Sequence, residues 1–402
     1  MFPLHRNDLT CPYCYQRFRV KEILFRCSGL AGRRKRCSTS VDHVLGEQMG
    51  EFQPKPPPFA ADGRRQEAVH PECGAVTHHR LCPRCHSMLP VQYVEIDNRL
   101  IALVGAKESG KTVYMTVLLH ELANSVGERF GASLLGADDP TRTRFEDDYE
   151  KQLYERHQLF GATKSAVATA GGRRPLVFNL AVGRPKSRAR EVTRTTLSFF
   201  DTAGEDMRTD HGVDQNVRYL SSADAIILLL DPLQLSGARP LADADALLPV
   251  EGGATDGPTA VLSRIIELLR ASGAAPAQRK IGKPLAVAFT KMDALAGALP
   301  EGNPLARPPS VRPVFDDADG LAVHRYMQAL LRDWAGHNLE TSLANNFERY
   351  RFFGLSALGE SPRLDDEGDG MQRVSSPHGW RVEDPLLWLL AEFGVIGKDG
   401  RR

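Results

Sequence analysis

The sequence predicts a three-layer α/β/α fold with a mostly parallel sheet, preceded by a small cysteine-rich module. From Arg99 onward, short apolar runs alternate with segments of helical character. Continuous apolar strands separated by helices are typical of a parallel sheet covered on both faces. The module is predicted by the cysteines, because all 7 of them lie between Cys11 and Cys85.

Length and composition narrow the class of protein. A chain of 402 residues usually forms two domains, or one large domain with an appendage. We expect a metal-binding module with a Pro-rich spacer over residues 1–96 and the α/β domain over residues 97–402. Hydrophobic residues make up 42% and charged residues 25%, which excludes global disorder. The net charge of +1 gives no general attraction to nucleic acid or membrane.

The strands are predicted by six apolar runs. They are RLIALVG (99–105), PLVFNLAVG (175–183), TLSFFDTAG (196–204), ADAIILLLD (223–231), KPLAVAFTK (283–291) and RYRFFGLSA (349–357). The long connections over residues 127–174 and 233–283 are predicted to be insertions. In VEDPLLWLLAEFGVI (382–396), proline near the start and apolar residues at helical spacing predict a closing helix. The Pro-rich stretch QPKPPPFAADG (53–63) is expected to be a spacer that cannot pair into a sheet.

A phosphate-binding turn is indicated by GAKESGKT, which lies between a predicted strand and a predicted helix and matches the pattern G-x-x-x-x-G-K-[ST]. The two glycines let several backbone N–H groups point at one phosphate beside a helix N-terminus. Lys111 is expected to reach the β- and γ-phosphates, and the Thr112 hydroxyl to ligate Mg²⁺. The alternative is a structural glycine turn with an incidental lysine. The residues predicted to bind nucleotide here are Gly105, Ser109, Gly110, Lys111, Thr112 and Val113.

Three further motifs follow predicted strands, where sheets of this kind bind their ligands. Asp201 in DTAGED is expected to hold Mg²⁺ through water, and the N–H of Gly204 to sense the γ-phosphate. In the second motif, Thr290-Lys291-Met-Asp293, the lysine would lie against a base. The Asp293 carboxylate would accept from N1–H and N2–H₂ of guanine, a pair of donors that adenine lacks. The third motif is Ser356-Ala357, whose backbone N–H would bind guanine O6.

With these four motifs in this order, residues 97–395 resemble a P-loop GTPase of the translation-factor and Ras-like superclass. Within that superclass, the chain most resembles bacterial double-GTPase-type domains, which often carry an N-terminal zinc ribbon. The resemblance implies the P-loop GTPase fold, GTP binding with Mg²⁺ and a nucleotide-controlled switch. It also implies slow GTP hydrolysis in bacterial signalling or conflict systems, by in-line attack of water on the γ-phosphate.

Two residues depart from the pattern of these GTPases. Thr290 stands where asparagine is commoner, and since that asparagine normally braces the phosphate loop, we expect lower nucleotide affinity. Glu205 follows DTAG where many small GTPases have a water-orienting glutamine. Its carboxylate would accept a proton from water but repel the γ-phosphate, so turnover is expected to be very slow or to need an arginine from a partner.

The switch segments are predicted near residues 161–174 and 204–212, where the γ-phosphate would order the loops and its release would relax them. The switch threonine is expected before the strand at 175–183, and Thr163 and Thr169 are the candidates. Arg173 and Arg174 either supply a charge in cis or are solvated loop arginines.

Metal ligation is the best account of the cysteines, because an odd count on one side of the chain argues against a disulfide framework. Seven cysteines and one histidine suffice for two tetrahedral Zn²⁺ sites. The predicted ligands are Cys11, Cys14, Cys27, Cys37, His70, Cys73, Cys82 and Cys85. We favour sequential pairing, the first four on one ion and the last four on the other, because local loops close at lower entropic cost.

The alternative pairing gives one ion the two outermost Cys-x₂-Cys pairs and the other ion the four inner ligands. His43, His78, His79 and His86 are rival ligands or surface histidines. The module either docks a protein or covers the site, or it contacts nucleic acid through the RRKR run at 33–36 and the neighbouring Arg64, Arg65 and Arg80. In the nucleic-acid reading, Tyr13, Tyr15 and Phe18 would stack bases, whereas such aromatics more often pack around the zinc.

The absence of an apolar span long enough for a bilayer and of a signal-peptide pattern predicts a cytoplasmic protein. The main prediction is therefore a GTP-binding protein that hydrolyses GTP slowly and contacts a protein partner. Three alternatives stay open: a GTP-gated binding module that does not hydrolyse, a zinc-ribbon nucleic-acid binder on a degenerate GTPase scaffold, and an ATPase, against which Asp293 argues.

Overall fold

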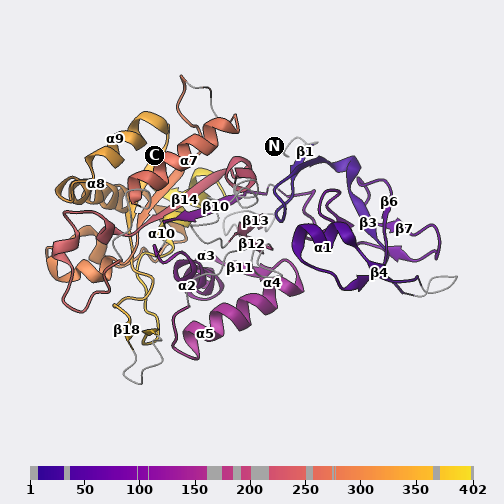
Figure 1. Ribbon diagram of the computed structural model, residues 1–402, viewed down its shortest axis with the longest axis horizontal. Coiled ribbons are helices and arrows are strands. Elements are labelled where there is room, and N and C mark those ends of the chain that lie inside the picture. Colours follow the sequence, from indigo (N-terminus) through magenta and orange to yellow (C-terminus); the bar gives the residue numbers. More distant parts are fainter. Residues whose placement is uncertain are drawn as a thin grey trace.

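The computed structural model describes residues 8–30, 37–96, 98–106, 108–160, 174–183, 192–200, 217–249, 257–273, 276, 278–364 and 372–399. Figure 1 shows a larger α/β part and a smaller N-terminal part that contains α1 and β1 to β7. Within the described residues, no helix is both long enough and apolar enough to cross a membrane.

The centre of the larger part is a four-stranded sheet in the order β10-β14-β15-β17. Its strands are β10 (Ile101–Gly105), β14 (Ala225–Leu230), β15 (Leu285–Phe289) and β17 (Tyr350–Gly354). Every neighbouring pair is parallel. All residues of β10, β14 and β15 are buried, which explains why these strands are continuous apolar runs in the sequence. The predicted parallel sheet is confirmed.

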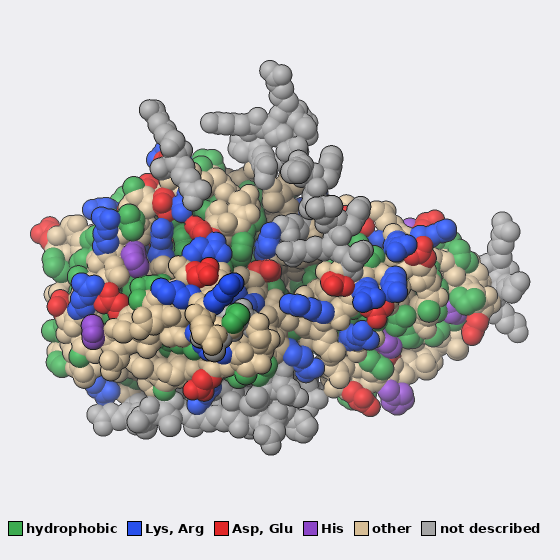
Figure 2. All heavy atoms as spheres, turned by 90° about the horizontal axis from the view of Figure 1, so that it is seen from above, with side chains coloured by type: hydrophobic (Ala, Val, Ile, Leu, Met, Phe, Trp, Pro, Cys, Tyr) green, Lys and Arg blue, Asp and Glu red, His purple; other side chains and the backbone are tan. Residues whose placement is uncertain are grey.

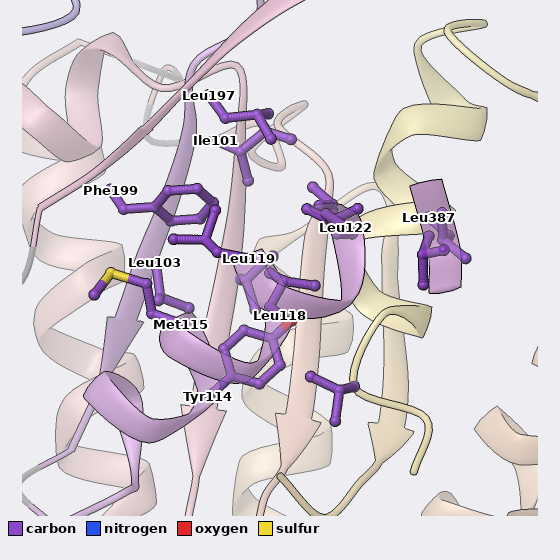
Figure 3. Packing of buried hydrophobic residues seen from close by; sticks show 14 of the residues in the cluster. Ile101, Leu103, Tyr114, Met115, Leu118, Leu119, Leu122, Leu197, Phe199 and Leu387 are labelled. Atoms are coloured by element: carbon purple, nitrogen blue, oxygen red, sulfur yellow. The ribbon is translucent and has the colours of Figure 1, made fainter. Parts of the chain in front are cut away.

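Helices cover both faces of this sheet, as the three-layer prediction requires. One face packs against α7 (Pro258–Ala271), α8 (Asp317–Asp333) and α9 (His337–Asn346). The other packs against α2 (Lys111–Ala123) and α10 (Asp384–Glu392). Figure 3 shows side chains of α2, such as Leu118 and Leu119, beside the strand residues Ile101 and Leu103. The closing helix predicted over residues 382–396 is α10.

Two further predicted strands belong to an antiparallel sheet of β11 (Ala132–Gly136), β12 (Leu176–Gly183) and β13 (Val192–Phe199). In Figure 3, Leu197 lies beside Ile101, and Phe199 lies near Leu103. Strand β13 therefore runs next to β10 in the same direction and ends at the same edge as the parallel strands. The described helices between α2 and β12 are α3 (Ser125–Phe130), α4 (Asp139–Arg144), the π-helical η2 (Phe145–Glu150) and α5 (Lys151–Tyr154).

Short elements complete the larger part. They are η4 (Pro232–Gln234), η5 (Arg239–Leu241), η6 (Met292–Ala298) and η7 (Pro304–Ala306), with the paired strands β16 (Val314–Asp316) and β20 (Gly397–Asp399), and β18 (Arg363–Leu364) and β19 (Gln372–Arg373).

The N-terminal part is built from very short strands. A central β3 (Leu24–Arg26) pairs with β6 (Pro58–Ala60) and β9 (Arg80–Leu81). Three hairpin-like pairs join β1 (Asp8–Thr10) to β2 (Arg17–Arg19), β4 (Ser40–Val41) to β5 (Pro54–Lys55), and β7 (Ala68–Val69) to β8 (Val76–Thr77). The described helices are η1 (Val20–Glu22) and α1 (His43–Met49). Asp42 caps α1 by accepting from the N–H of Leu45.

The expectation that the Pro-rich stretch cannot pair into a sheet is wrong. Two of its segments form β5 and β6, which pair with β4 and β3. In both cases proline is the first residue of the strand, and β6 lies at the edge of its sheet. Proline is tolerated at these positions because no ladder hydrogen bond needs its missing N–H.

Candidate nucleotide site and zinc centres

The predicted phosphate loop joins β10 to α2 and needs both of its glycines. A Cβ on Gly105 would collide with Ser109 Oγ and crowd the neighbouring strand β14. Gly110 has a φ of 73° and is the N-cap of α2, in a left-handed conformation that glycine adopts without strain. Lys111 and Thr112 are therefore the first two residues of α2, at the positive end of the helix dipole, which favours a bound phosphate.

The loop is braced by Thr290. Its buried hydroxyl lies 2.9 Å from the carbonyl oxygen of Ser109 in the loop and 3.2 Å from that of Leu230 at the end of β14. This is the bracing role expected of the commoner asparagine. Threonine supplies such a contact, so the reason for expecting lower nucleotide affinity does not hold in this structure.

Replacing Thr290 with valine should weaken GTP binding about fivefold. The change keeps the shape of the side chain but leaves the carbonyl of Ser109 without its donor, a loss of about 1 kcal/mol. Thr77→Val is a matched control, because the buried Thr77 hydroxyl also donates to a backbone carbonyl, that of Arg26 in the N-terminal part. Fluorescent GTP titration of both variants is the measurement, and equal affinities would show that the brace does not act on the loop.

Lys291 is positioned by an aspartate that sequence reasoning missed. The ammonium of Lys291 lies 2.7 Å from a carboxylate oxygen of Asp231, which is fully buried. Asp231 directly follows β14 and also accepts from the N–H of Leu233. The signal in the sequence is the aspartate that ends the apolar run ADAIILLLD. Because Asp231 holds the amine, the aliphatic stem of Lys291 is restrained at the edge of the sheet.

Asp293 and Ser356 lie together although they follow different strands. The Ser356 side chain lies close enough to the Asp293 carboxyl to favour its ionised form, and Ser356 itself is fully buried. Burial raises the pKa of Asp293 above its usual value, and the neighbouring Ser356 side chain, a backbone N–H and the charge of Lys291 oppose this rise. Ala357, the next residue of the third motif, is also buried. The two predicted guanine motifs thus meet at the carboxyl edge of β15 and β17.

The remaining nucleotide-site predictions fall outside the described residues. These are Asp201, Gly204 and Glu205 after β13, and Thr163, Thr169 and Arg173 in the first predicted switch segment. Their roles stay predictions. Val113 is described as a half-buried residue in the first turn of α2.

The predicted metal ligands form two groups of four. One contains Cys11, Cys14, Cys82 and Cys85, and the other contains Cys27, Cys37, His70 and Cys73. Within each group the ligand atoms all lie within 4.8 Å of one another. The sulfur atoms of Cys11 and Cys85 are 3.7 Å apart, and those of Cys14 and Cys82 are 3.9 Å apart. A tetrahedral ion with Zn–S bonds of about 2.3 Å requires sulfur separations of about 3.8 Å, so the thiols fit zinc.

Backbone donors also suit thiolates in both groups. The N–H of Tyr13 lies 3.4 Å from the sulfur of Cys11, that of Arg84 lies 3.3 Å from Cys82, and that of Gly29 lies 3.4 Å from Cys27. In the second group, the hydrogen bond from the N–H of Ala75 is the main cause that lowers the pKa of Cys73 to about 7. All the cysteines are free thiols.

The sequential pairing of ligands is wrong, and the alternative pairing is the one in the structure. The reason lies in the antiparallel ladder of β3 and β9, where Leu24 pairs with Leu81 and Phe25 with Arg80. Cys27 therefore leaves one end of this ladder and Cys82 leaves the other. The pairing of β3 with β9 decides which ligands lie together, although local loops would close at lower entropic cost. The spacing of the cysteines in the sequence does not reveal this strand pairing.

The rival histidines belong to neither group. His86 lies 2.9 Å from one carboxylate oxygen of Asp42, and the guanidinium of Arg26 lies 2.7 Å from the other. This buried set holds α1 against β3 and accounts for His86 without a metal. Tyr13, Tyr15 and Phe18 are each no more than 2% exposed, so the alternative in which they stack bases does not hold. Tyr13 and Phe18 pack in one cluster with the cysteines of the first group, as the favoured interpretation expects. Arg80 is buried as well and pairs with Glu95.

The first zinc group is docked on the larger part through Tyr15. This side chain packs between Phe200 and Tyr219, with ring centroids 6.1 and 4.8 Å away. Its hydroxyl bonds to Ser198 Oγ at 3.2 Å, and its carbonyl accepts from the hydroxyl of Ser222 at 2.8 Å. Tyr15 thereby joins the core that covers one face of the parallel sheet.

Tyr13 makes a second contact between the two parts. Its hydroxyl donates to Asp138 at 2.6 Å, and the same carboxylate oxygen lies 2.7 Å from the guanidinium of Arg174. Arg174 also pairs with Glu51 at 3.0 Å, lies over the ring of Tyr13, and has an 11% exposed side chain. It is therefore neither a solvated loop arginine nor available as a charge in cis, because both sides of its guanidinium are engaged.

Three features together define a P-loop GTPase. They are the glycine-lysine loop before α2, the Thr290 contact that braces this loop, and the neighbouring Asp293 and Ser356 at the predicted guanine-binding position. The chain belongs to the Double-GTPase 2 family, whose model matches residues 99–352. Membership indicates guanine nucleotide binding, while the two cysteine-rich groups are suited to zinc.

One relative covers most of the chain. The Mycolicibacterium smegmatis protein named "Putative ESX-1 scaffolding and assembly protein SaeC" is 29% identical over 360 residues, which are 85% of each protein.

Solved structures of P-loop GTPases are also similar. The signal recognition particle receptor SRb-GTP/SRX complex from Chaetomium thermophilum has 13% identity and a TM-score of 0.28, with 66% of this chain and 94% of that chain covered. The Saccharomyces cerevisiae Ski7 GTPase-like domain bound to GTP has 12% identity and a TM-score of 0.34, with coverages of 73% and 50%. At such low scores the family assignment rests on the family match and on the site.

Proposed function

We propose that the chain binds GTP with Mg²⁺, hydrolyses it slowly, and acts as a nucleotide-controlled switch. Lys111 binds the phosphates, Thr112 and Asp201 hold Mg²⁺, Gly204 senses the γ-phosphate, and Asp293 reads guanine. The observation that supports this best is the meeting of the Thr290-braced phosphate loop and the Asp293–Ser356 pair at one sheet edge. Ligands of parallel α/β sheets bind at this edge.

The zinc module, which we take as residues 1–96, is the proposed output of the switch. Its Tyr13 is tied through Asp138 to Arg174, the last residue of the first predicted switch segment. Its Tyr15 packs on Phe200 and Tyr219, which lie close before and after the second segment. A nucleotide-dependent change in either segment therefore moves a residue that contacts the module, as an order–disorder switch requires.

The partner of the switch is proposed to be a protein. The relative SaeC is named as a scaffolding and assembly protein, and a docked module that follows the nucleotide state suits assembly of a protein complex. The burial of Tyr13, Tyr15 and Phe18 removes the aromatic platform on which a single-stranded nucleic acid would stack.

Single-turnover GTP hydrolysis tests whether the switch resets itself. We expect slow hydrolysis by the zinc-loaded chain and about tenfold faster hydrolysis after Glu205→Gln, because the change removes a charge that repels the γ-phosphate while keeping a group that orients water. Lys111→Ala is the control that should bind no nucleotide. Bound GTP that stays intact in both the wild type and Glu205→Gln would make the protein a GTP-gated binding module rather than a hydrolase.

A further inference from the structure

A cavity of about 550 Å³ lies where the zinc module meets the larger part. Both parts contribute to its wall: Arg17 and Arg84 come from the module, and Arg218 and Ser272 come from the larger part. Arg17 is on β2, Arg84 is inside the Cys82–Cys85 turn, and Ser272 directly follows α7. Figure 2 shows Lys and Arg side chains on both sides of the place where the two parts meet.

The cavity carries positive charge that is only partly neutralised. Three arginines line it, and among the described residues no aspartate or glutamate does. Arg84 pairs with Glu22 at 3.1 Å. In the described part of the chain, neither Arg17 nor Arg218 forms an ion pair, and the buried Nε of Arg218 donates to no acceptor. A buried donor without a partner calls for an explanation, and a ligand oxygen is one.

The hydroxyl groups of the cavity are already used as donors. Ser221 donates to the carbonyl of Arg218 at 3.1 Å, Ser222 to that of Tyr15 at 2.8 Å, and Ser272 to that of Leu269 at 2.9 Å. The side-chain donors left for a ligand are therefore the guanidinium groups and the amide of Gln16. Behind the wall, the ammonium of Lys283 donates to the carbonyl of Ser221 at 2.9 Å, and the nearby Asp224 carboxylate partly offsets its charge.

We propose that this cavity binds a small molecule that carries two or more phosphate groups. Guanidinium groups bind phosphate oxygens in pairs and with better geometry than ammonium groups. The volume lies within the range of about 300 to 1,000 Å³ of small-molecule sites and exceeds the space of a single phosphate. A ligand held by Arg17 and Arg218 at once would clamp the zinc module onto the larger part. This site is separate from the phosphate loop and goes beyond the proposed GTP switch.

Isothermal titration with inorganic pyrophosphate tests the proposal on the zinc-loaded full chain. Lys111→Ala serves as the background for all variants, since it removes binding at the phosphate loop. We expect one pyrophosphate per chain, and about tenfold weaker binding or more after Arg17→Gln or Arg218→Gln, because each change removes a charge-assisted contact. Arg218→Lys should retain part of the affinity. Arg19→Gln is the matched control, since Arg19 is an exposed arginine of β2 outside the cavity.

Three results would overturn the proposal: no pyrophosphate binding to the Lys111→Ala chain, equal binding after Arg17→Gln and Arg218→Gln, or an equal loss after Arg19→Gln. Binding of single-stranded RNA with a steep salt dependence, without pyrophosphate binding, would also overturn it and would assign the arginines to nucleic acid. Zinc content and circular dichroism after the titration exclude metal loss and unfolding as causes. Because GTP binding is measured separately with Lys111 intact, failure here leaves the proposed GTP site untouched.

Discussion

Replacing Asp293 with asparagine should lower the affinity for GTP about 100-fold and leave the affinity for ATP almost unchanged, since each charge-assisted hydrogen bond lost to guanine is worth about 1.5 to 3 kcal/mol. An amide at this position also turns an N–H₂ group toward the donors of guanine. Titration with fluorescent GTP and ATP analogues measures both affinities.

The pH dependence of GTP binding should change with the same substitution. Only the ionised carboxylate accepts both guanine hydrogens, and burial raises the pKa of Asp293 above the usual aspartate value. GTP binding by the wild type should therefore weaken as the pH falls, starting at a higher pH than an exposed aspartate would give. Asp293→Asn should lack this step. Asp333→Asn, a surface change at the end of α8, is the control that should keep it, and an identical pH profile for all three proteins would contradict the assigned role.

Replacing Cys14 with serine should remove one zinc ion and release the N-terminal module from the larger part. Structural zinc sites contribute on the order of 10 kcal/mol of folding free energy in small zinc domains. Cys14 precedes Tyr15, whose left-handed φ of 60° is strained for this residue and is held by the ligand turn. We expect zinc analysis to fall from two ions per chain to one, and amide exchange to rise over residues 11–15 and at β13.

Cys73→Ser is the matched variant for the second zinc group, which is built around the β7–β8 hairpin. It should also lose one zinc ion, yet residues 11–15 should stay protected, because Tyr13 and Tyr15 belong to the first group. If both variants exposed residues 11–15 equally, the docking contact would depend on the whole module rather than on the first zinc turn. If neither variant lost zinc, the two groups would not be metal sites.

The sequence was sufficient to predict the features that depend on the local pattern of apolar and polar residues. Strands such as Leu285–Phe289 are continuous apolar runs because both faces are covered. The guanine motifs could be placed together because each directly follows a strand of one parallel sheet, and such strands end at a common edge. The sequence did not reveal which side chains form hydrogen bonds and ion pairs with one another across that edge. The Thr290 brace and the Asp231–Lys291 pair depend on side-chain reach between strands.

Features that depend on distant pairing could not be read from the sequence. The zinc ligands divide according to the β3–β9 ladder, which joins residues far apart in the chain, whereas spacing alone favoured neighbouring ligands. Tyr15 reads as an aromatic residue beside a zinc turn, but its position in the core depends on Phe200 and Tyr219. The basic cavity likewise combines arginines from three separate segments, and no motif in the sequence indicates that these arginines lie together.

The central claim is that the phosphate loop and the Asp293–Ser356 pair form one guanine nucleotide site. Competitive titration of the zinc-loaded chain with GTP and ATP in the presence of Mg²⁺ tests this claim most directly, with Lys111→Ala as the control. We expect GTP to bind about 100-fold or more tightly than ATP, which lacks the paired donors for Asp293, and Lys111→Ala to bind neither. Equal affinities for GTP and ATP, or GTP binding that survives Lys111→Ala, would contradict it.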